Sequence, residues 1–339
     1  MESVNRAAWS LEPKGDLKPS AAPYTPPSGN ELVIKNHAFA IQPLDANIRG
    51  RAYVDLPYPF ILGNGVAGVV EEVGSSVTKF KKGDRVVSDT PAYHQKIAKY
   101  GGWQKYVVSA EATTAKIPAA TTFEDAAAIP FALLTAVAAL NLKLGMKKPG
   151  SHEDGRVLIW SASGSVGGYA VQYASSVGYD VVATASPGKF EYVRSLGARQ
   201  VVDYKDEQAI SKLKALGPYE FVMTASGDVA GAHAISEILQ PEGGVFVSTR
   251  PHSEEMHLAE NVELLYDFYS MATQKPENAA FSKWWYEEYL PVALAGGVTP
   301  TPLEKRGGGL SGIQNACEDV LNGRSAKKLI INPQEEEEE

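Results

Sequence analysis

Five short apolar runs, separated by stretches of helical composition, constrain the fold of this chain more than any other feature. The runs lie at residues 156–160, 180–184, 200–204, 220–225 and 244–249. Helices are expected at 166–177 and near 188–196, 207–216 and 230–239. Strands that alternate with helices form parallel, doubly wound sheets, and strands buried on both faces are continuously apolar, as these are. The sequence therefore predicts a parallel sheet covered by helices.

The first 125 residues have a different pattern, with short β-branched runs broken by Gly and Pro. These runs, expected as strands, lie at 31–41, 65–73, 84–88 and 103–109. Runs of this kind with frequent turns predict a mostly β unit. Further helices are expected at 125–144 (with a break near Pro130), 258–272, 281–297 and 313–321, and a last strand at 326–333.

Length and charge exclude several classes of protein. A chain of 339 residues predicts two domains. A net charge of −8 without a basic stripe argues against a nucleic-acid partner. No apolar run reaches the ~18 residues that cross a bilayer, and the N-terminus lacks the apolar core of a signal peptide, so we expect no membrane anchor and a cytoplasmic protein. The Glu run at 335–339 is typical of a solvated tail. The one cysteine, Cys317, is expected to be a small buried hydrophobe.

The stretch SASGSVGG, at 161–168, joins the first of the alternating runs to the helix that follows it. It has the spacing A-x-G-x-x-G, at Ala162, Gly164 and Gly167. A glycine-rich turn in this position lets backbone amides approach a pyrophosphate, and the helix N-terminus favours its negative charge. A Gly-rich turn of this kind also occurs by chance, but the strand before it and the helix after it favour a dinucleotide site.

The end of the second run indicates which nicotinamide is bound. NAD-binding chains place an Asp or Glu there to hold the ribose 2′-hydroxyl, and this chain has Ser186 and Lys189 instead. A hydroxyl and an ammonium suit a 2′-phosphate, so the sequence favours NADPH. The alternative for Lys189 is an ordinary solvated lysine at a helix start.

Four segments in order resemble the medium-chain dehydrogenase/reductase superfamily over residues ~10 to 333. They are PFILGNGVAGVVEEVGSSVTKFKKGDRVV (59–87), GGWQKYVV (101–108), AAAIPFALLTA (126–136) and the dinucleotide turn with LGARQVVDY (196–204). The resemblance implies a GroES-like domain at 1–125, completed by about 295–333, and a Rossmann domain at 126–294. It implies an active site in the cleft between them. The Glu run predicts an acidic disordered tail at 334–339.

The chain departs from the zinc-dependent members of this superfamily. Their G-H-E segment is similar to GNGV at 63–66, where Asn64 replaces the histidine and Gly65 the glutamate. Their first cysteine has no counterpart in 37–45, and the six histidines are scattered without the family's spacing. Since a catalytic zinc needs about three protein ligands, we expect no metal.

The zinc-free branch contains quinone, alkenal and enoyl reductases. NRAAW (5–9), VIKNHAFAIQPLD (33–45) and TASPGKFEYVRSLGA (184–198) are most similar to fungal stand-alone enoyl reductases that work in trans with polyketide synthases. The resemblance implies hydride transfer from NADPH to the β-carbon of an α,β-unsaturated carbonyl, with a free or carrier-bound acyl substrate. The alternatives are a quinone or alkenal reductase, a repurposed biosynthetic oxidoreductase, and a non-catalytic NADPH-binding protein.

Residue roles follow from the resemblance position by position. Thr135 is expected beside the nicotinamide, as are Ser248 and Thr249 at the end of the fifth run. Pyrophosphate contacts are expected at Ser163, Gly164, Ser165, Val166 and Gly167, and the 2′-phosphate pocket at Ser186 and Lys189. Tyr204 is expected at the adenosine-side ribose, or else as a strand-end aromatic in the core.

One substitution concerns the chemistry itself. Many relatives read N-P-x-D-x-K, and this chain reads Gln42-Pro43-Leu44-Asp45-Ala46-Asn47. Pro43 is expected at the cofactor, and Asn47 replaces the lysine. An amide can donate a hydrogen bond to an enolate oxygen but cannot supply a proton as an ammonium does. The sequence thus leaves the proton donor open.

Four aromatic residues, Trp284, Trp285, Tyr286 and Tyr289, stand close together in the region expected to set substrate choice. Core packing is one interpretation. A flat apolar wall for a long acyl chain is the other.

Overall fold

The computed structural model describes residues 5–151 and 154–335. The chain divides into two compact units, Met1–Phe131 with Thr273–Glu339 (unit 1) and Ala132–Ala272 (unit 2). The sequence placed the boundaries near 125 and 295, so 273–294 lies with unit 1 rather than with the Rossmann unit. Most of the expected acidic tail, 336–339, falls outside the described residues.

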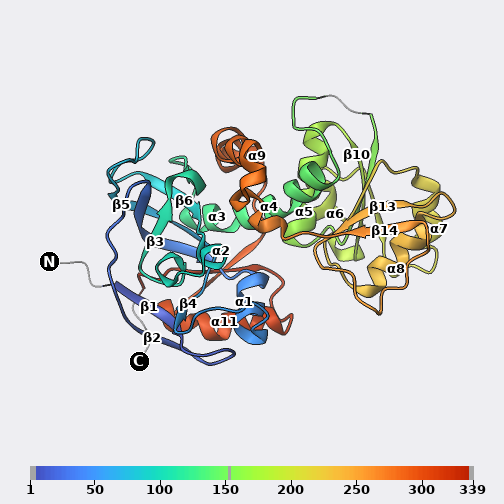
Figure 1. Cartoon of the computed structure of the whole chain (residues 1–339). Helices are drawn as coiled ribbons and strands as arrows, with labels where there is room; N and C mark the ends of the chain where they lie inside the picture. The colour runs from blue at the N-terminus through green and yellow to red at the C-terminus, as the bar shows by residue number, and fades with distance from the viewer. Residues whose placement is uncertain (1–4, 152–153, 336–339) are drawn as a thin grey trace. The chain divides into compact units, whose positions relative to one another are not determined.

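Unit 2 is built on a parallel sheet of six strands, in the order β11-β10-β9-β12-β13-β14. Figure 1 shows β13 and β14 side by side. The strands are β9 Arg156–Trp160, β10 Asp180–Ala185, β11 Gln200–Asp203, β12 Phe221–Thr224, β13 Gly244–Ser248 and β14 Val262–Leu265. The helices between them are α5 Ser165–Val177, α6 Phe190–Ser195, α7 Ala209–Leu216 and α8 Val229–Ile238. The predicted doubly wound sheet is confirmed.

The helix expected at 258–272 was wrong. This region forms the edge strand β14 and then the 3-10 helix η5, Tyr269–Gln274. Val262 contributes to the core under the sheet, together with Phe246 and Ile235. The apolar residues had suggested a helical face, but pairing with β13 satisfies the backbone here, and Val262 is buried as part of a strand.

Unit 1 contains a seven-stranded sheet, with the order β15-β16-β3-β5-β6-β8 and β7 paired to β3. Its strands are β3 Glu31–Ala40, β5 Gly65–Val73, β6 Arg85–Asp89, β7 Tyr106–Ala110, β8 Thr114–Lys116, β15 Leu303–Arg306 and β16 Lys328–Ile331. A smaller sheet joins β1 Asn5–Ser10, β2 Leu17–Ala22 and β4 Phe60–Ile61. The mostly β unit that the sequence predicted is confirmed, with the C-terminal strands completing it.

The chain from 276 to 297 is a run of short helical pieces: η6 Pro276–Asn278, α9 Ala279–Trp284, η7 Trp285–Tyr289, α10 Leu290–Val292 and η8 Ala293–Gly297. Phe281 stacks on Trp285, and Trp284 stacks on Tyr289. These rings are mostly withdrawn from solvent, which supports core packing for three of the four aromatics noted in the sequence. Tyr286 is buried as well, and its hydroxyl makes the hydrogen bonds that are described below.

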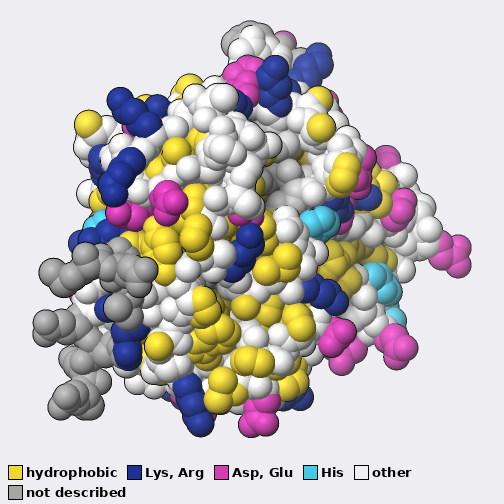
Figure 2. All heavy atoms as spheres, turned by 60° about the vertical axis from the view of Figure 1, so that its left-hand side comes forward, with side chains coloured by type: hydrophobic (Ala, Val, Ile, Leu, Met, Phe, Trp, Pro, Cys, Tyr) yellow, Lys and Arg dark blue, Asp and Glu magenta, His cyan; other side chains and the backbone are white. Residues whose placement is uncertain are grey.

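The remaining helices include α1 Pro43–Arg51 and α11 Ile313–Leu321, which pack together in unit 1. Cys317 lies on α11 and is fully buried, as expected, and burial raises the pKa of its thiol. On the face shown in Figure 2, basic and acidic side chains are interspersed with hydrophobic ones.

One helical stretch, Phe123–Lys143, has the length and apolar composition of a membrane span. It comprises α3 Phe123–Ala128, α4 Pro130–Val137 and the π-helix η3 Ala138–Lys143. Its apolar window is 78% buried inside the protein, as in the core helix of a globular fold.

Candidate functional site

The dinucleotide turn is fixed to the neighbouring strand β10. Ser161 has a φ of 64°, a left-handed conformation that is uncommon for residues with a side chain. Its amide donates to Thr184 Oγ1 at 2.9 Å, and the amide of Ala162 donates to the Thr184 carbonyl at 2.9 Å. Ala162 is fully buried, so a small side chain fits at the position of the family's first glycine.

The two glycines of the turn have different structural roles. A Cβ on Gly167 would lie 2.4 Å from the Ser161 carbonyl oxygen, so only glycine lets helix α5 approach the strand this closely. A Cβ on Gly164 would meet nothing within 4 Å. Gly164 therefore borders open space at the N-terminus of a 13-residue helix, without a side-chain cap. Backbone amides and the helix dipole there suit a pyrophosphate.

The predicted 2′-phosphate residues follow β10. Ser186 is half-buried at the start of η4 (Pro187–Lys189), and Lys189 is exposed. The nearest strand-end acid, Asp203, pairs in register with Ala185, and its Oδ1 accepts the amide of Lys205. This edge of the sheet thus has a hydroxyl and an ammonium where NAD-binding chains have a carboxylate.

Tyr204 lies outside the core. Its side chain is 43% exposed, with its ring centroid 6.4 Å from that of Trp160. An exposed ring after β11 is available to a ribose, which favours the first of the two interpretations from the sequence.

The predicted nicotinamide residues are more enclosed. Ser248 is fully buried and its Oγ accepts the amide of Arg250, while Thr249 Oγ1 donates to the Ala225 carbonyl. Thr135 lies on α4 and is 8% exposed. Because β9, β10 and β13 are parallel, the turn, Ser186 and Thr249 lie at the same carboxyl edge of the sheet, where ligands bind in doubly wound folds.

The remaining predicted residues lie on helix α1 in unit 1, Pro43 at its first position and Asn47 one turn later. Asn47 Nδ2 donates to the Pro43 carbonyl at 2.7 Å. One of its two N–H groups is therefore engaged within the helix, and that bond fixes the orientation of the amide.

Sequence reasoning missed a buried polar pair that joins this helix to Tyr93. Asp45 is fully buried and accepts a hydrogen bond from the Tyr93 hydroxyl at 2.7 Å, which itself accepts the amide of Gly63. Burial raises the pKa of Asp45 to about 7, against the opposing effect of the Tyr93 bond. Nearby, Lys328 Nζ donates to Gln42 Oε1 at 2.7 Å, and burial lowers the pKa of this lysine to about 8. Partners 48 and 286 residues apart leave no local signal in the sequence.

Asn64 was noted in the sequence only as a replacement for histidine. Its side chain is 1% exposed, and within the described part of the chain neither Nδ2 nor Oδ1 has a hydrogen-bond partner. Such unpaired groups are rare in protein interiors and costly.

The residues present do not fit a catalytic zinc. Among the described residues, no group of three or more His, Cys, Asp or Glu side chains could hold a metal ion. His37 stacks on Phe123, and His233 stacks on His257. No step of the chemistry below is therefore assigned to a metal.

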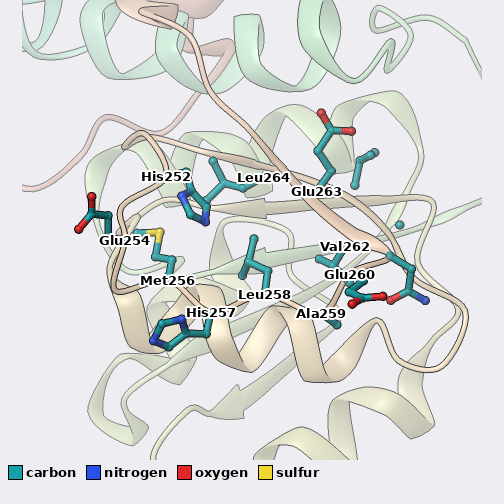
Figure 3. Close-up of a pocket in the computed structure, with 13 residues that line it drawn as sticks. His252, Glu254, Met256, His257, Leu258, Ala259, Glu260, Val262, Glu263 and Leu264 are labelled. Carbon is teal, nitrogen blue, oxygen red and sulfur yellow. The ribbon is translucent and has the colours of Figure 1, made fainter.

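A hollow of about 910 Å³ lies elsewhere in unit 2, at the edge strand β14 (Figure 3). It is lined by Glu263 and Leu264 of the strand and by the segment before it, which carries His252 and His257. None of the predicted cofactor residues lines this hollow, so it is separate from the dinucleotide turn.

Comparison with known proteins identifies the family. Two family models match: "Alcohol dehydrogenase GroES-like domain" over residues 28–119 and "Zinc-binding dehydrogenase" over 165–266. A dehydrogenase of Monascus ruber, pigH, is 35% identical and aligns over 97% of this chain and 99% of its own. The trans-enoyl reductase himH of Aspergillus japonicus is 30% identical, with 97% of each chain covered. The chain belongs to the medium-chain dehydrogenase/reductase superfamily and is an oxidoreductase of that fold.

A solved structure supports the architecture. The quinone oxidoreductase of Escherichia coli, complexed with NADPH, superposes with a TM-score of 0.76 at 22% identity, covering 98% of this chain and 100% of that one. At this identity the likeness establishes the fold, a GroES-like domain and a Rossmann domain.

Proposed function

We propose that the protein is an NADPH-dependent, zinc-independent reductase that adds hydride to the β-carbon of an α,β-unsaturated carbonyl. The observation that carries the proposal is the dinucleotide turn, with open space over Gly164, combined with the lack of any zinc-binding cluster of side chains among the described residues. A reduced nicotinamide supplies the hydride when bound. The work left to the protein is to hold the cofactor, to stabilise the developing enolate and to supply a proton.

Residues of the chain are assigned to these tasks as follows. The pyrophosphate is held by the turn residues Ser163, Gly164, Ser165, Val166 and Gly167. The nicotinamide is bordered by Thr135, Ser248, Thr249 and Pro43. Asn47 donates to the enolate oxygen through the N–H that Pro43 leaves available. An oriented amide needs little reorganisation as charge develops.

The cofactor preference rests on Ser186 and Lys189. Their hydroxyl and ammonium groups bind a 2′-phosphate through charge-assisted hydrogen bonds, and Tyr204 packs against the neighbouring ribose. A carboxylate in this position would repel the phosphate and favour NADH.

The substrate is proposed to be an enoyl thioester of polyketide biosynthesis, free or attached to the carrier of a synthase. The name of himH, a trans-enoyl reductase, supports this assignment. Reduction of a quinone is the second candidate function, because the similar solved structure is that of a quinone oxidoreductase.

The test is oxidation of NADPH, with NADH as control, by purified protein. The substrates are a short 2-enoyl thioester, a methyl-branched one, an enal, a quinone and a ketone. Turnover of an enoyl thioester with NADPH is expected. Reduction of the quinone alone would favour the second candidate, and bound NADPH without any turnover would contradict both.

Replacing Asn47 by Ala is expected to lower kcat by about tenfold, the effect of one hydrogen bond to a charged group.

A further inference from the structure

The proton that completes the reduction has no source in the residues assigned so far. Asn47 cannot supply it, and the family's lysine is absent. A buried acid in unit 1 has no role in the reaction as described. Asp89, the last residue of β6, is 3% exposed and accepts a hydrogen bond from the Tyr286 hydroxyl at 2.8 Å.

The pair links parts of the chain that are far apart in sequence. Asp89 pairs in register with Gly65, and its Oδ1 lies 3.7 Å from the position of a Cβ on that glycine. Gly65 is where the family's G-H-E segment has its glutamate. The space that a side chain at 65 would occupy thus faces a carboxyl supplied by the adjacent strand.

Tyr286 lies between this acid and a groove. The groove has a volume of about 810 Å³, and its lining includes Tyr286, Thr273 and Gln274, while Asp89 does not line it. Thr273 Oγ1 lies 3.4 Å from the Tyr286 hydroxyl. The other aromatics of this helical segment stack on one another, whereas Tyr286 joins a buried carboxyl to a cavity.

Burial raises the pKa of Asp89 to about 7, although the hydrogen bond from Tyr286 acts in the opposite direction. Asp89 has uncharged neighbours, namely Gly65, Thr90, Thr273 and Gln274. The titratable group that contacts it is Tyr286. The charged side chains of the groove are Lys79, Lys116, Lys275, Lys283, Glu111 and Glu287. Lys79 pairs with Glu287 and Lys116 with Asp84, so these two lysines are already engaged by other carboxylates.

We propose, on the basis of the reductase function above, that the α-carbon of the substrate reaches this groove and that Asp89 and Tyr286 form the proton relay of the reaction. The protonated carboxyl donates to the Tyr286 oxygen, which frees the phenolic hydrogen to point into the groove. Hydride adds to the β-carbon, and the π electrons move onto the carbonyl as an enolate. The enolate then takes the Tyr286 proton at its α-carbon, and Tyr286 takes the proton of Asp89. Water in the groove then protonates Tyr286, which passes a proton back to Asp89.

The first test uses the wild-type enzyme and its pH dependence. With an enoyl thioester that is turned over, kcat is expected to fall above a pH of about 7, because Asp89 then loses its proton. Replacing Asp89 by Asn should remove this break. Replacing Tyr286 by Phe should lower kcat by about 100-fold, the lower end of general-acid contributions. The controls are Tyr289→Phe, on the same helical segment, and Asp84→Asn, at the residue directly before the same strand, and both should keep the wild-type profile.

The second test reads the stereochemistry of protonation, which a structural role would leave unchanged. Wild-type enzyme should reduce a 2-methyl-2-enoyl thioester to one configuration at the α-carbon. Tyr286→Phe should give a mixture, because water then protonates either face of the enolate.

A third measurement is thermal stability. In the protein without cofactor, Asp89→Asn should raise Tm more at pH 8 than at pH 5, since it removes the cost of ionising a buried acid.

These outcomes separate the two proposals. Wild-type turnover with an unchanged pH profile and unchanged stereochemistry in both variants would overturn the relay alone. No turnover of any enoyl thioester by the wild-type protein would overturn the reductase function and the relay with it.

Discussion

The dinucleotide turn of unit 2 and the buried polar pairs of unit 1 differ in how far apart in the sequence their residues lie. The turn is local: Ser161 to Gly168 are consecutive, and their glycine spacing is visible in the sequence. The polar residues of unit 1 form pairs, Asp45 with Tyr93 and Asp89 with Tyr286, whose members are 48 and 197 residues apart. A turn made by consecutive residues can be read from the sequence, whereas a pair made by residues far apart in the chain needs the fold.

The largest effect is expected in the turn, where packing is tightest. Gly167→Val should abolish folding of unit 2 or cofactor binding, because even its Cβ would overlap the Ser161 carbonyl. Gly164→Ala should leave the fold intact and weaken NADPH binding, since its Cβ enters the space assigned to the pyrophosphate. Thermal unfolding and NADPH titration would measure both. Equal losses of stability in the two variants would contradict this distinction between the glycines.

The next largest effect concerns the pH dependence of stability in unit 1. The pKa of Asp45 rises from an ordinary 3.8 to about 7 on folding. The folded state thus holds a proton that the unfolded chain has lost, so stability should decrease as pH rises from about 4 to about 7. The change from this group is at most about 4 kcal/mol. Urea unfolding across this range should show the decrease in the wild type and a weaker one in Asp45→Asn. Parallel curves would mean that Asp45 titrates normally.

Sequence patterns predicted most of the fold because they reflect burial. The five continuously apolar runs correspond to strands β9 to β13. The short runs between frequent turns in the first 125 residues correspond to the strands of a mostly β unit. The sixth strand, β14, was missed because its pairing with β13, not its own composition, defines it. For the same reason Asp89, Tyr286 and Lys328 carry no signal: what perturbs each of them is burial by distant elements.

Cofactor choice is a smaller and sharper test of the local region. Lys189→Ala should raise the Kd of NADPH by about tenfold, the value of one charge-assisted contact, and leave that of NADH unchanged. Ser186→Asp should add repulsion and reverse the preference. The exposed Lys205 after β11 offers a matched control, since it contacts Tyr204 rather than the end of β10. A loss of affinity for both cofactors in Lys189→Ala would place this lysine away from the 2′-phosphate.

The smallest expected effect compares two buried asparagines of unit 1. Asn36 Nδ2 donates to the carbonyls of Gly102 and Gln104 at 2.9 and 3.1 Å, whereas Asn64 has no partner for either amide atom among the described residues. Asn36→Leu should therefore destabilise the protein by about 1–3 kcal/mol, because it leaves carbonyls unpaired. Asn64→Leu has nearly the same shape and loses no bond, so stability should stay equal or increase by about 1 kcal/mol. Urea unfolding of both variants measures the difference. Destabilisation of Asn64→Leu would mean that an internal water satisfies this amide, whereas lost turnover at unchanged stability would mean that its partner is the substrate.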